Sequence, residues 1–309
     1  MAQITNQYNL PQAIMNALHR PTYSKGNAHI SVTQAINSPR IVALRDKYDK
    51  EITVDATDLL WSLFGSAVHQ ILEQSAGEEH LTEERIFTEV NGWVFSGAID
   101  SQICHANGTR TIQDYKVTKA WSVMQDKVEW EQQLNIYKWL VETVKKTPVS
   151  KLQVVAIIRD WSRHESRENY PKAPVVTLDI PMWTHEEAQS YIEHRVKLHQ
   201  EAFTSLSLGE DLAPCTPEDM WVKPAVYAVK KEGRKTAIRL HVSQAEAEDH
   251  VLQLGKGHYI EKRPEERTRC ANFCDVKNFC NQWRNYETSI SSIDQRGENG
   301  EVRSEEGVQ

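Results

Sequence analysis

Residues 92–121 decide the fold, and they read GWVFSGAIDSQICHANGTRTIQDYKVTKAW. Two runs of alternating apolar and polar residues flank Asn107-Gly108, a dipeptide typical of hairpin turns. A second dipeptide of this kind, Asn91-Gly92, stands at the start of the first run. The pattern predicts a meander of three antiparallel strands near residues 84–91, 93–103 and 109–117.

The predicted strands carry charged residues where a core would be apolar. Asp100 lies on the first run, and Asp114 and Lys116 lie on the second. Residues i and i+2 of a strand point to the same face, so Asp114 and Lys116 emerge together and Asp100 can lie beside them. Two carboxylates this close repel each other unless a divalent cation neutralises them. The alternative is a set of solvated polar residues on an edge strand, and the triad alone leaves both readings open.

Helical patterns surround these strands. In residues 55–77, apolar residues recur every three or four positions, which is typical of a helix buried on one face and capped by Asp55 or Thr57. Before it, Pro39 is expected to interrupt a short helix capped by Ser31 or Thr33. Further helices are predicted near residues 11–19, 121–145 and 184–206, and strands near 151–160 and 174–181. This order predicts an α/β fold in which a central mixed sheet is flanked by helices.

Composition sets the broad class of the protein. The chain has 309 residues, of which 39% are apolar, enough for a sizeable core. It contains no apolar run long enough to span a bilayer, and its first residues do not resemble a signal peptide. Five cysteines in such a chain favour metal ligands or buried thiols over disulfides. We therefore expect a cytoplasmic protein without a membrane partner.

Charge is spread unevenly along the chain. The net charge is −7, yet residues 222–286 contain thirteen Lys or Arg and eight Asp or Glu. A locally basic segment fits either nucleic-acid binding or a solvated face. The last residues are acidic and almost free of apolar side chains, which is typical of disorder. The expected parts are an N-terminal helical segment over 1–28, an α/β core over 29–206, a basic cysteine-rich element over 207–286 and a disordered tail over 287–309.

Several short motifs resemble one known family, the PD-(D/E)xK nucleases, and within it the RecB-like branch. GSAVHQILE places His69 four residues after Gly65, as in the Gly-x-x-x-His helix of that branch. SGAID ends at Asp100 and IQDYK ends at Lys116, which matches the second and third motifs of the family in type, order and spacing. The resemblance implies a restriction-endonuclease-like core over the α/β segment. It also implies that Gly65 lets its helix approach the sheet closely.

A fourth motif, QQLNIYKWL, holds Gln133 and Tyr137 at the spacing of the Gln-x-x-x-Tyr signature of the branch. At i and i+4 both side chains lie on one face of the predicted helix. The resemblance implies that Lys116 acts on the nucleophile and that Gln133 and Tyr137 lie near the DNA backbone. The implied ligands of Mg²⁺ or Mn²⁺ are His69, Asp100, Asp114 and the carbonyl oxygen of Tyr115.

A cysteine motif follows near the C-terminus. RCANFCDVKNFCNQW spaces Cys270, Cys274 and Cys280 as C-x₃-C-x₅-C among aromatic residues that would exclude water, and such a trio can hold one metal centre. RecB-like relatives of the CRISPR-adaptation and AddB types carry C-x₂-C-x₅-C with one earlier cysteine, and they bind a [4Fe–4S] cluster. Here Ser38 stands in place of that earlier cysteine, so we expect Cys215 as the fourth ligand and Cys104 as a buried thiol. The implied cofactor is a [4Fe–4S] cluster, with structural Zn²⁺ as the alternative.

These patterns predict a metal-dependent deoxyribonuclease, an exonuclease or a single-strand-acting enzyme in recombination, repair or phage DNA metabolism. The expected partners are single-stranded DNA or duplex ends and a recombination or replication protein, in a bacterial or phage-infected cytoplasm. Within the basic segment, the residues expected to contact DNA are Lys230, Lys231, Arg234 and Lys235. Two alternatives stay open: a nucleic-acid-binding protein without turnover, and an RNA nuclease. The chain has no G-x-x-x-x-G-K-[ST] motif, so no helicase motor is expected.

Overall fold

The chain divides into two compact units, Met1–Leu212 and Ala213–Gln309. The computed structural model describes residues 2–20 and 25–298, with side chains as far as residue 290. The boundary between the units lies close to the start of the cysteine-rich element that the sequence predicts. No helix in the described part of the chain is long and apolar enough to cross a membrane.

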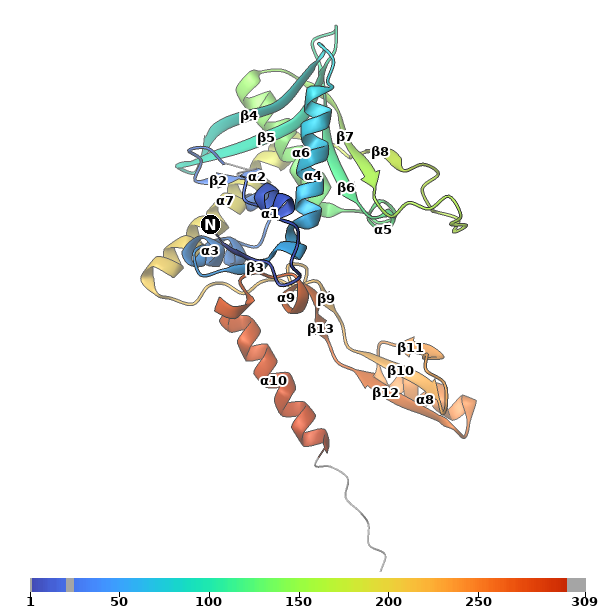
Figure 1. Cartoon of the computed structure of the whole chain (residues 1–309). Helices are drawn as coiled ribbons and strands as arrows, with labels where there is room; N and C mark the ends of the chain where they lie inside the picture. The colour runs from blue at the N-terminus through green and yellow to red at the C-terminus, as the bar shows by residue number, and fades with distance from the viewer. Residues whose placement is uncertain (1, 21–24, 299–309) are drawn as a thin grey trace, which may run out of the picture. The chain divides into compact units, whose positions relative to one another are not determined.

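A six-stranded mixed sheet forms the centre of the first unit (Figure 1). Its strands are β2 (Ile30–Ser31), β4 (His80–Val90), β5 (Trp93–Cys104), β6 (Arg110–Thr118), β7 (Val149–Ile158) and β8 (Val175–Asp179). β4, β5 and β6 form the predicted meander, and β6 pairs with β7 in parallel. Asn91 and Gly92 both have positive φ, 50° and 77°, as a two-residue hairpin turn requires. The predicted fold class is confirmed.

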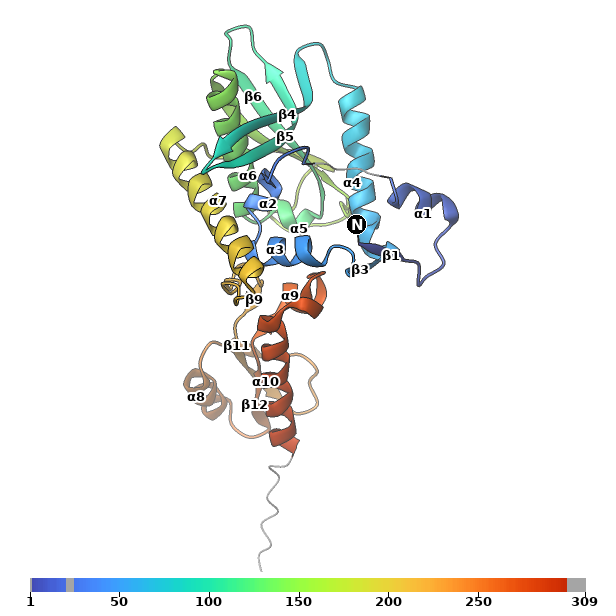
Figure 2. The same cartoon turned by 90° about the vertical axis from the view of Figure 1, so that its left-hand side faces the viewer.

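Helices cover both faces of this sheet. The helices of the first unit are α1 (Gln12–Leu18), α2 (Val32–Ala35), α3 (Pro39–Tyr48), α4 (Ala56–Gln74), α5 (Ala120–Val123), α6 (Val128–Leu140), the π-helical turn η1 (Val141–Lys145) and α7 (His185–Leu208). α6 packs on the sheet with α2 and α7, and α4 lies on the other side (Figure 2). A separate parallel pair joins β1 (Gln3–Thr5) to β3 (Thr53–Asp55) ahead of α4.

Local signals explain where the first helices begin. Ser31 and Gln34 form a reciprocal capping box at the start of α2. Pro39 was expected to interrupt a helix, but it stands in the first turn of α3. Proline suits that position because the first N–H groups of a helix have no partner within the helix. Asp55 caps α4 by accepting the N–H of Thr57 at 3.1 Å.

The core of the first unit lies on the side of the sheet that carries α6. Every residue of α6 from Gln133 to Leu140 is buried, because the sheet covers one side of the helix and α2 and α7 cover others. Gly97 of β5 permits this close approach. A Cβ atom at position 97 would lie 2.7 to 2.9 Å from side-chain atoms of Leu140, Tyr137 and Val32, closer than real Cβ contacts allow.

The environment of α4 differs from the prediction. Its periodic pattern predicted a helix buried on one face, but Ala56 is the only buried residue among its described positions. Trp61, Phe64 and Ile71 are 56%, 56% and 62% exposed. The prediction failed because the turns toward the sheet carry small and polar residues that line a cavity, and these leave the apolar side of α4 facing outward.

As far as residue 298, the second unit contains two small sheets and four helical segments. The strands are β9 (Val222–Lys223), β10 (Val226–Lys231), β11 (Arg239–His241), β12 (His258–Arg263) and β13 (Glu266–Arg267). The helices are α8 (Gln244–Leu254), α9 (Thr268–Asn272), the 3₁₀ turn η2 (Lys277–Phe279) and α10 (Asn281–Glu298). The tail predicted to be disordered from residue 287 is therefore helical as far as residue 298, and its remainder lies outside the described residues. Tyr286 anchors the start of α10, because its hydroxyl donates to the Glu265 carbonyl at 2.5 Å.

Candidate active site

The strands β5 and β6 separate at the site. Their pairing runs from Cys104 with Arg110 to Ser101 with Gln113 and ends there. The next register position would place Asp100 opposite Asp114, beyond the last ladder hydrogen bond. The ladder thus ends where the two predicted acids lie, and there Asp100 Oδ2 bridges the strands by accepting the N–H of Tyr115 at 2.8 Å.

A cavity of about 870 Å³ occupies this opening. The residues that line it from α4 include Ser62, Ser66 and His69, and those from the strands include Asp100, Asp114 and Lys116. Arg20 and Arg85 also reach its wall. Gly65 lines the cavity too, but a Cβ atom there would meet nothing within 4 Å, so the predicted close approach to the sheet is wrong.

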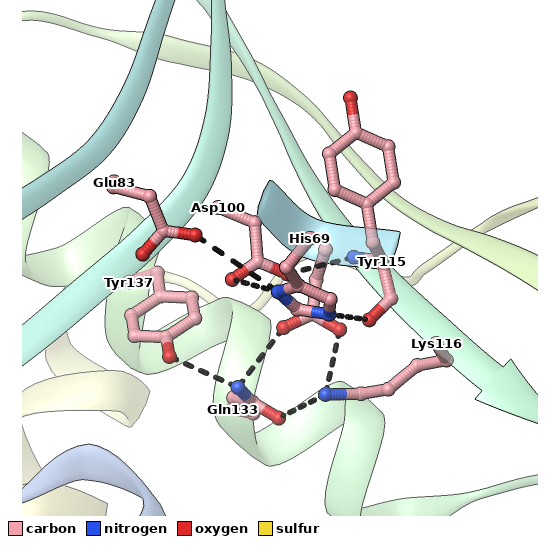
Figure 3. Close-up of polar contacts among 8 residues, drawn as sticks. His69, Glu83, Asp100, Tyr115, Lys116, Gln133 and Tyr137 are labelled. Carbon is pink, nitrogen blue, oxygen red and sulfur yellow. Dashed lines mark hydrogen bonds and ion pairs between the residues drawn. The ribbon is translucent and has the colours of Figure 1, made fainter. Parts of the chain in front are cut away.

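Gln133 connects Asp114 to Lys116. Its amide nitrogen donates to Asp114 Oδ1 at 3.0 Å and to the Tyr137 hydroxyl at 2.9 Å, and its amide oxygen accepts from Lys116 Nζ at 3.1 Å (Figure 3). Lys116 Nζ also lies 2.7 Å from Asp114 Oδ2. Gln133 and Tyr137 are buried. They are therefore placed to position Asp114 and Lys116, and their contact with a DNA backbone stays a prediction.

His69 reaches the opening from α4 (Figure 3). Its Nε2 lies 2.9 Å from the carbonyl oxygen of Tyr115, and because that oxygen can only accept, Nε2 carries the proton. Nδ1 then faces Asp100 Oδ1 at 3.6 Å and Glu83 Oε1 at 3.9 Å. Glu83 raises the pKa of His69, against the effect of burial and together with Asp100 and the Tyr115 carbonyl. In its neutral form the ring would direct the Nδ1 lone pair toward the carboxylates, as a metal ligand does.

The electrostatics of the opening favour a bound cation. Burial and the charge of Asp114 raise the pKa of Asp100 to about 7. Burial disfavours the charge on Lys116, but Asp114 beside it outweighs that effect and raises the pKa of the ammonium group. Asp100 and Lys116 thus hold their protons more tightly than usual, because negative charge is concentrated in this opening. A divalent cation would satisfy the same charges, so these residues fit a metal ion.

One acid in the opening was missed by the sequence analysis. Ligand atoms of His69, Glu83 and Asp100 lie within 4.8 Å of one another, the only such group of three or more in the described part of the chain. The register of β4 with β5 would place Glu83 opposite Asp100, and the ladder omits this pair. Glu83 has a φ of 49°, unusual for a residue other than glycine. Counting residues back from the Asn91-Gly92 turn would have placed Glu83 opposite Asp100, but the predicted strand began at residue 84 and so left Glu83 out.

The cysteines lie in the second unit, with one exception. Cys104 ends β5 and is exposed, so the prediction of a buried thiol is wrong. Cys215 is buried, and its backbone N–H and carbonyl both bond the side chain of Gln282, two residues beyond Cys280. Burial, with the neighbouring Cys274 and Cys280, raises the pKa of Cys270 to about 11.

Two other residues of the second unit lie differently from expectation. Phe273 was expected to shield the cysteines, but it is 66% exposed and its ring lies 5.5 Å from that of Trp221. Lys230 was expected to contact DNA, but it pairs with Glu261 at 2.8 Å and its side chain is only 15% exposed. The other cations of that cluster, Lys231, Arg234 and Lys235, are exposed.

Comparison with known families assigns the chain. A family model described as the PD-(D/E)XK nuclease superfamily matches residues 78–281, well over half of the sequence. The chain belongs to the PD-(D/E)XK nuclease superfamily. The match includes Asp100, Asp114, Lys116 and Gln133, and it extends one residue beyond Cys280, the last cysteine of the motif. Nucleic acid is therefore the substrate class of this nuclease.

Solved structures resemble this nuclease only distantly. The crystal structure of SSO0001 gives a TM-score of 0.43 at 20% identity, covering 60% of this chain and 84% of that one. The crystal structure of a "Putative exonuclease" from Eubacterium rectale gives 0.30 at 11% identity, covering 48% of this chain and 55% of that one. A search of curated proteins finds no match. The assignment to the superfamily rests on the family model.

Proposed function

We propose that this nuclease is a DNA exonuclease or single-strand nuclease that hydrolyses phosphodiester bonds with bound Mg²⁺ or Mn²⁺. The observation that carries the proposal is the set of Asp100, Asp114 and Lys116, held at a break in the sheet beside a cavity of about 870 Å³. The cavity also receives Arg20 and Arg85, which can pair with phosphate oxygens. Such a wall suits an anionic polymer and brings its backbone to the carboxylates.

The residues of the opening would have different roles in hydrolysis. His69, Glu83 and Asp100, with Asp114, would hold the metal ion. When bound, a divalent ion supplies Lewis-acid polarisation of the phosphate and lowers the pKa of water. Lys116 is charged and aimed by Asp114 and Gln133, so it can orient the attacking water or stabilise negative charge on the scissile phosphate.

A cleavage assay tests this function. Labelled single-stranded DNA, duplex DNA and RNA of one sequence would each be incubated with Mg²⁺, with Mn²⁺ or with a chelator. We expect cleavage of DNA that requires the ion. Lys116→Met should lower the rate by about 10²- to 10⁴-fold while the protein stays folded, because a positioned proton donor or charge is lost. Lys151→Met is the matched control, since Lys151 is an exposed lysine outside the cavity.

The outcomes separate the alternatives. Binding without ion-dependent cleavage would identify an inactive nucleic-acid-binding protein, and cleavage confined to RNA would identify an RNA nuclease. Retained cleavage in Lys116→Met would remove Lys116 from the reaction. Substrates blocked at the 5′ or the 3′ end would decide whether the enzyme needs a free end.

The second unit is proposed to hold a structural metal centre, as in the RecB-like branch. Cys215, Cys270, Cys274 and Cys280 are the proposed ligands, and the contact of Gln282 with Cys215 supports the inclusion of Cys215. The preference for a [4Fe–4S] cluster over a single zinc ion rests on the resemblance of the C-x₃-C-x₅-C spacing to that of the branch.

The organisation of the chain is proposed to follow this division of work. The first unit would perform cleavage, and the second would be a metal-dependent element that contacts DNA through Lys231, Arg234 and Lys235. A recombination or replication protein is the proposed partner. A pull-down from a cell extract supplemented with DNA, with the Lys116→Met variant as bait, would test for this partner.

A further inference from the structure

The helix α4 exposes aromatic side chains next to the cavity. Ser62, Ser66 and His69 line the cavity, whereas Trp61 and Phe64 on the neighbouring side of the helix are each 56% exposed. Their ring centroids lie 5.8 Å apart at an interplanar angle of 37°. Aromatic side chains contribute strongly to stability when buried, so two adjacent exposed rings are costly unless they serve recognition.

A cation is already stacked on one ring of this aromatic pair. The guanidinium of Arg159 lies 3.7 Å from the centroid of the Trp61 ring. Arg159 directly follows β7, and its N–H donates to the carbonyl of Thr118 at 2.9 Å. Thr118 is the last residue of β6, the strand that carries Lys116. The aromatic pair and its cation therefore lie at the end of the strand that leads out of the cavity.

A second pair of the same kind lies at that strand end. Trp121 of α5 is 59% exposed, and Lys127 Nζ lies 4.5 Å from the centroid of its ring. The N–H of Ala120 donates to Asp160 Oδ1 at 2.7 Å, which ties α5 to the residue after Arg159. α5 follows the end of β6 (Figure 1). Two exposed aromatic groups, each with its own cation, thus share the exit of β6 and β7.

We infer that Trp61, Phe64 and Trp121, with Arg159 and Lys127, form a stacking surface for unpaired nucleotides of the strand that enters the cavity. The inference rests on the proposed nuclease function and names its substrate as single-stranded. Every base has a flat π face that an aromatic ring can stack on, and phosphates between the bases are neutralised by the adjacent cations. Duplex DNA offers no such faces, because its bases are stacked on one another.

The cations argue against an apolar protein partner on this surface. A protein that covered Trp61 and Trp121 would also desolvate Arg159 and Lys127, and neither charge would then be compensated without dedicated acids. A nucleic-acid strand supplies a negative charge at every nucleotide. The alternation of rings and cations therefore matches the alternation of bases and phosphates.

The test compares two strands of equal charge. A fluorescent oligothymidylate and an abasic strand of the same length would be titrated with the full-length protein in a chelator, so that binding is measured without cleavage. We expect the wild-type protein to bind the base-bearing strand about tenfold or more tightly than the abasic strand, because alanine substitution puts stacking at about 1–3 kcal/mol per base. Trp61→Leu and Phe64→Leu should each remove most of this preference, and Trp61→Phe should retain it.

Ile71 supplies the control, since it is 62% exposed on the same helix and lies outside the cavity wall. Ile71→Ala should leave the preference for the base-bearing strand unchanged. Equal binding of the two strands by the wild-type protein, or an undiminished preference in Trp61→Leu, would overturn the stacking surface. If Ile71→Ala weakens binding as much as Trp61→Leu does, the face is a general apolar docking surface and the inference is also wrong.

Failure of this inference is distinguishable from failure of the proposed function. An enzyme that cleaves DNA but shows no preference for bases would overturn the stacking surface alone. A protein that prefers the base-bearing strand but never cleaves it would overturn the proposed hydrolysis alone. Circular dichroism of each variant would exclude misfolding as the cause of lost preference.

Discussion

Glu83 joins the candidate ligands through a single backbone conformation. Its φ of 49° interrupts the ladder between β4 and β5 and brings its carboxylate within 3.9 Å of His69 Nδ1. If Glu83 is a ligand, Glu83→Gln should weaken Mn²⁺ binding by about tenfold or more, because the amide keeps the size of the side chain but loses its charge. Titration calorimetry or electron paramagnetic resonance of Mn²⁺ would measure the affinity directly.

An acid outside the cavity provides the control for Glu83. Glu79→Gln alters an exposed carboxylate that does not line the cavity, so Mn²⁺ affinity should stay at the wild-type value. Equal affinities in Glu83→Gln and wild type would show that His69, Asp100 and Asp114 suffice for the ion. Glu83 would then act only through the ring of His69.

Two glycines should respond in opposite ways to the same added methyl group. At Gly97 the new Cβ would collide with Leu140, Tyr137 and Val32, so Gly97→Ala should lower the free energy of unfolding by about 1–3 kcal/mol. At Gly65 the new Cβ meets nothing within 4 Å inside a helix, so Gly65→Ala should raise it by up to about 1 kcal/mol. Denaturant titration of both variants measures the difference. Equal effects would contradict the packing described for Gly97.

At the scale of elements, the packing of α7 on α2 depends on a buried neutral histidine. His199 of α7 is fully buried, and its Nε2 lies 3.2 Å from the Ala35 carbonyl of α2. Burial, with a smaller contribution from Arg195, lowers the pKa of His199 to about 4. Between pH 4 and the ordinary histidine value near 6.5, the unfolded chain binds a proton that the folded protein does not. Stability is therefore lost as pH falls through this range, by about 2 kcal/mol between pH 7 and pH 5.

His199→Gln isolates this contribution. Glutamine retains an N–H donor for the Ala35 carbonyl but does not titrate, so the variant should lose about 2 kcal/mol less than the wild type between pH 7 and pH 5. Denaturant titrations at both pH values give the comparison, and they cancel the contributions of carboxylates that the two proteins share. The same acid sensitivity in both proteins would contradict a neutral His199.

At the scale of the whole molecule, the two compact units should differ in their dependence on metal. If Cys215, Cys270, Cys274 and Cys280 hold one structural centre, metal-binding energy is folding energy for the small second unit. Cys215→Ser should reduce metal content as much as Cys274→Ser does, and both should lower the thermal stability of that unit. Cys104→Ser is the control, because Cys104 is exposed in the first unit. Elemental analysis, visible absorbance and scanning calorimetry measure these effects.

The outcomes for the cysteines are separable. Full metal occupancy in Cys215→Ser would place the fourth ligand elsewhere. Iron with visible absorbance would identify a cluster, and zinc without colour would identify a single ion. Loss of cleavage in parallel with metal content would show that the second unit supports the first.

The sequence by itself determined the order of the main elements and the residues of the candidate catalytic motifs. Alternation of apolar residues, the Asn91-Gly92 turn and the spacing of Asp114 and Lys116 are local properties, and local geometry converts them into strands, a hairpin and a shared strand face. The sheet and the membership of the superfamily followed from them. Helix periodicity likewise located α4, α6 and α7, because 3.6 residues per turn is a property of any helix.

Only the tertiary structure decided which faces are buried and which side chains meet. The apolar side of α4 was predicted to lie in the core, yet Trp61 and Phe64 are exposed, because periodicity reveals that a helix has an apolar side but not what packs against it. The carboxylate of Glu83 lies close to His69 and Asp100 because of the register of β4 with β5 and because Glu83 has a positive φ, which its residue type does not predict. Gln133 holds Asp114 and Lys116 because Gly97 lets α6 approach the sheet, a contact between segments far apart in the chain. Such contacts depend on the packing of several elements at once, and no local pattern encodes them.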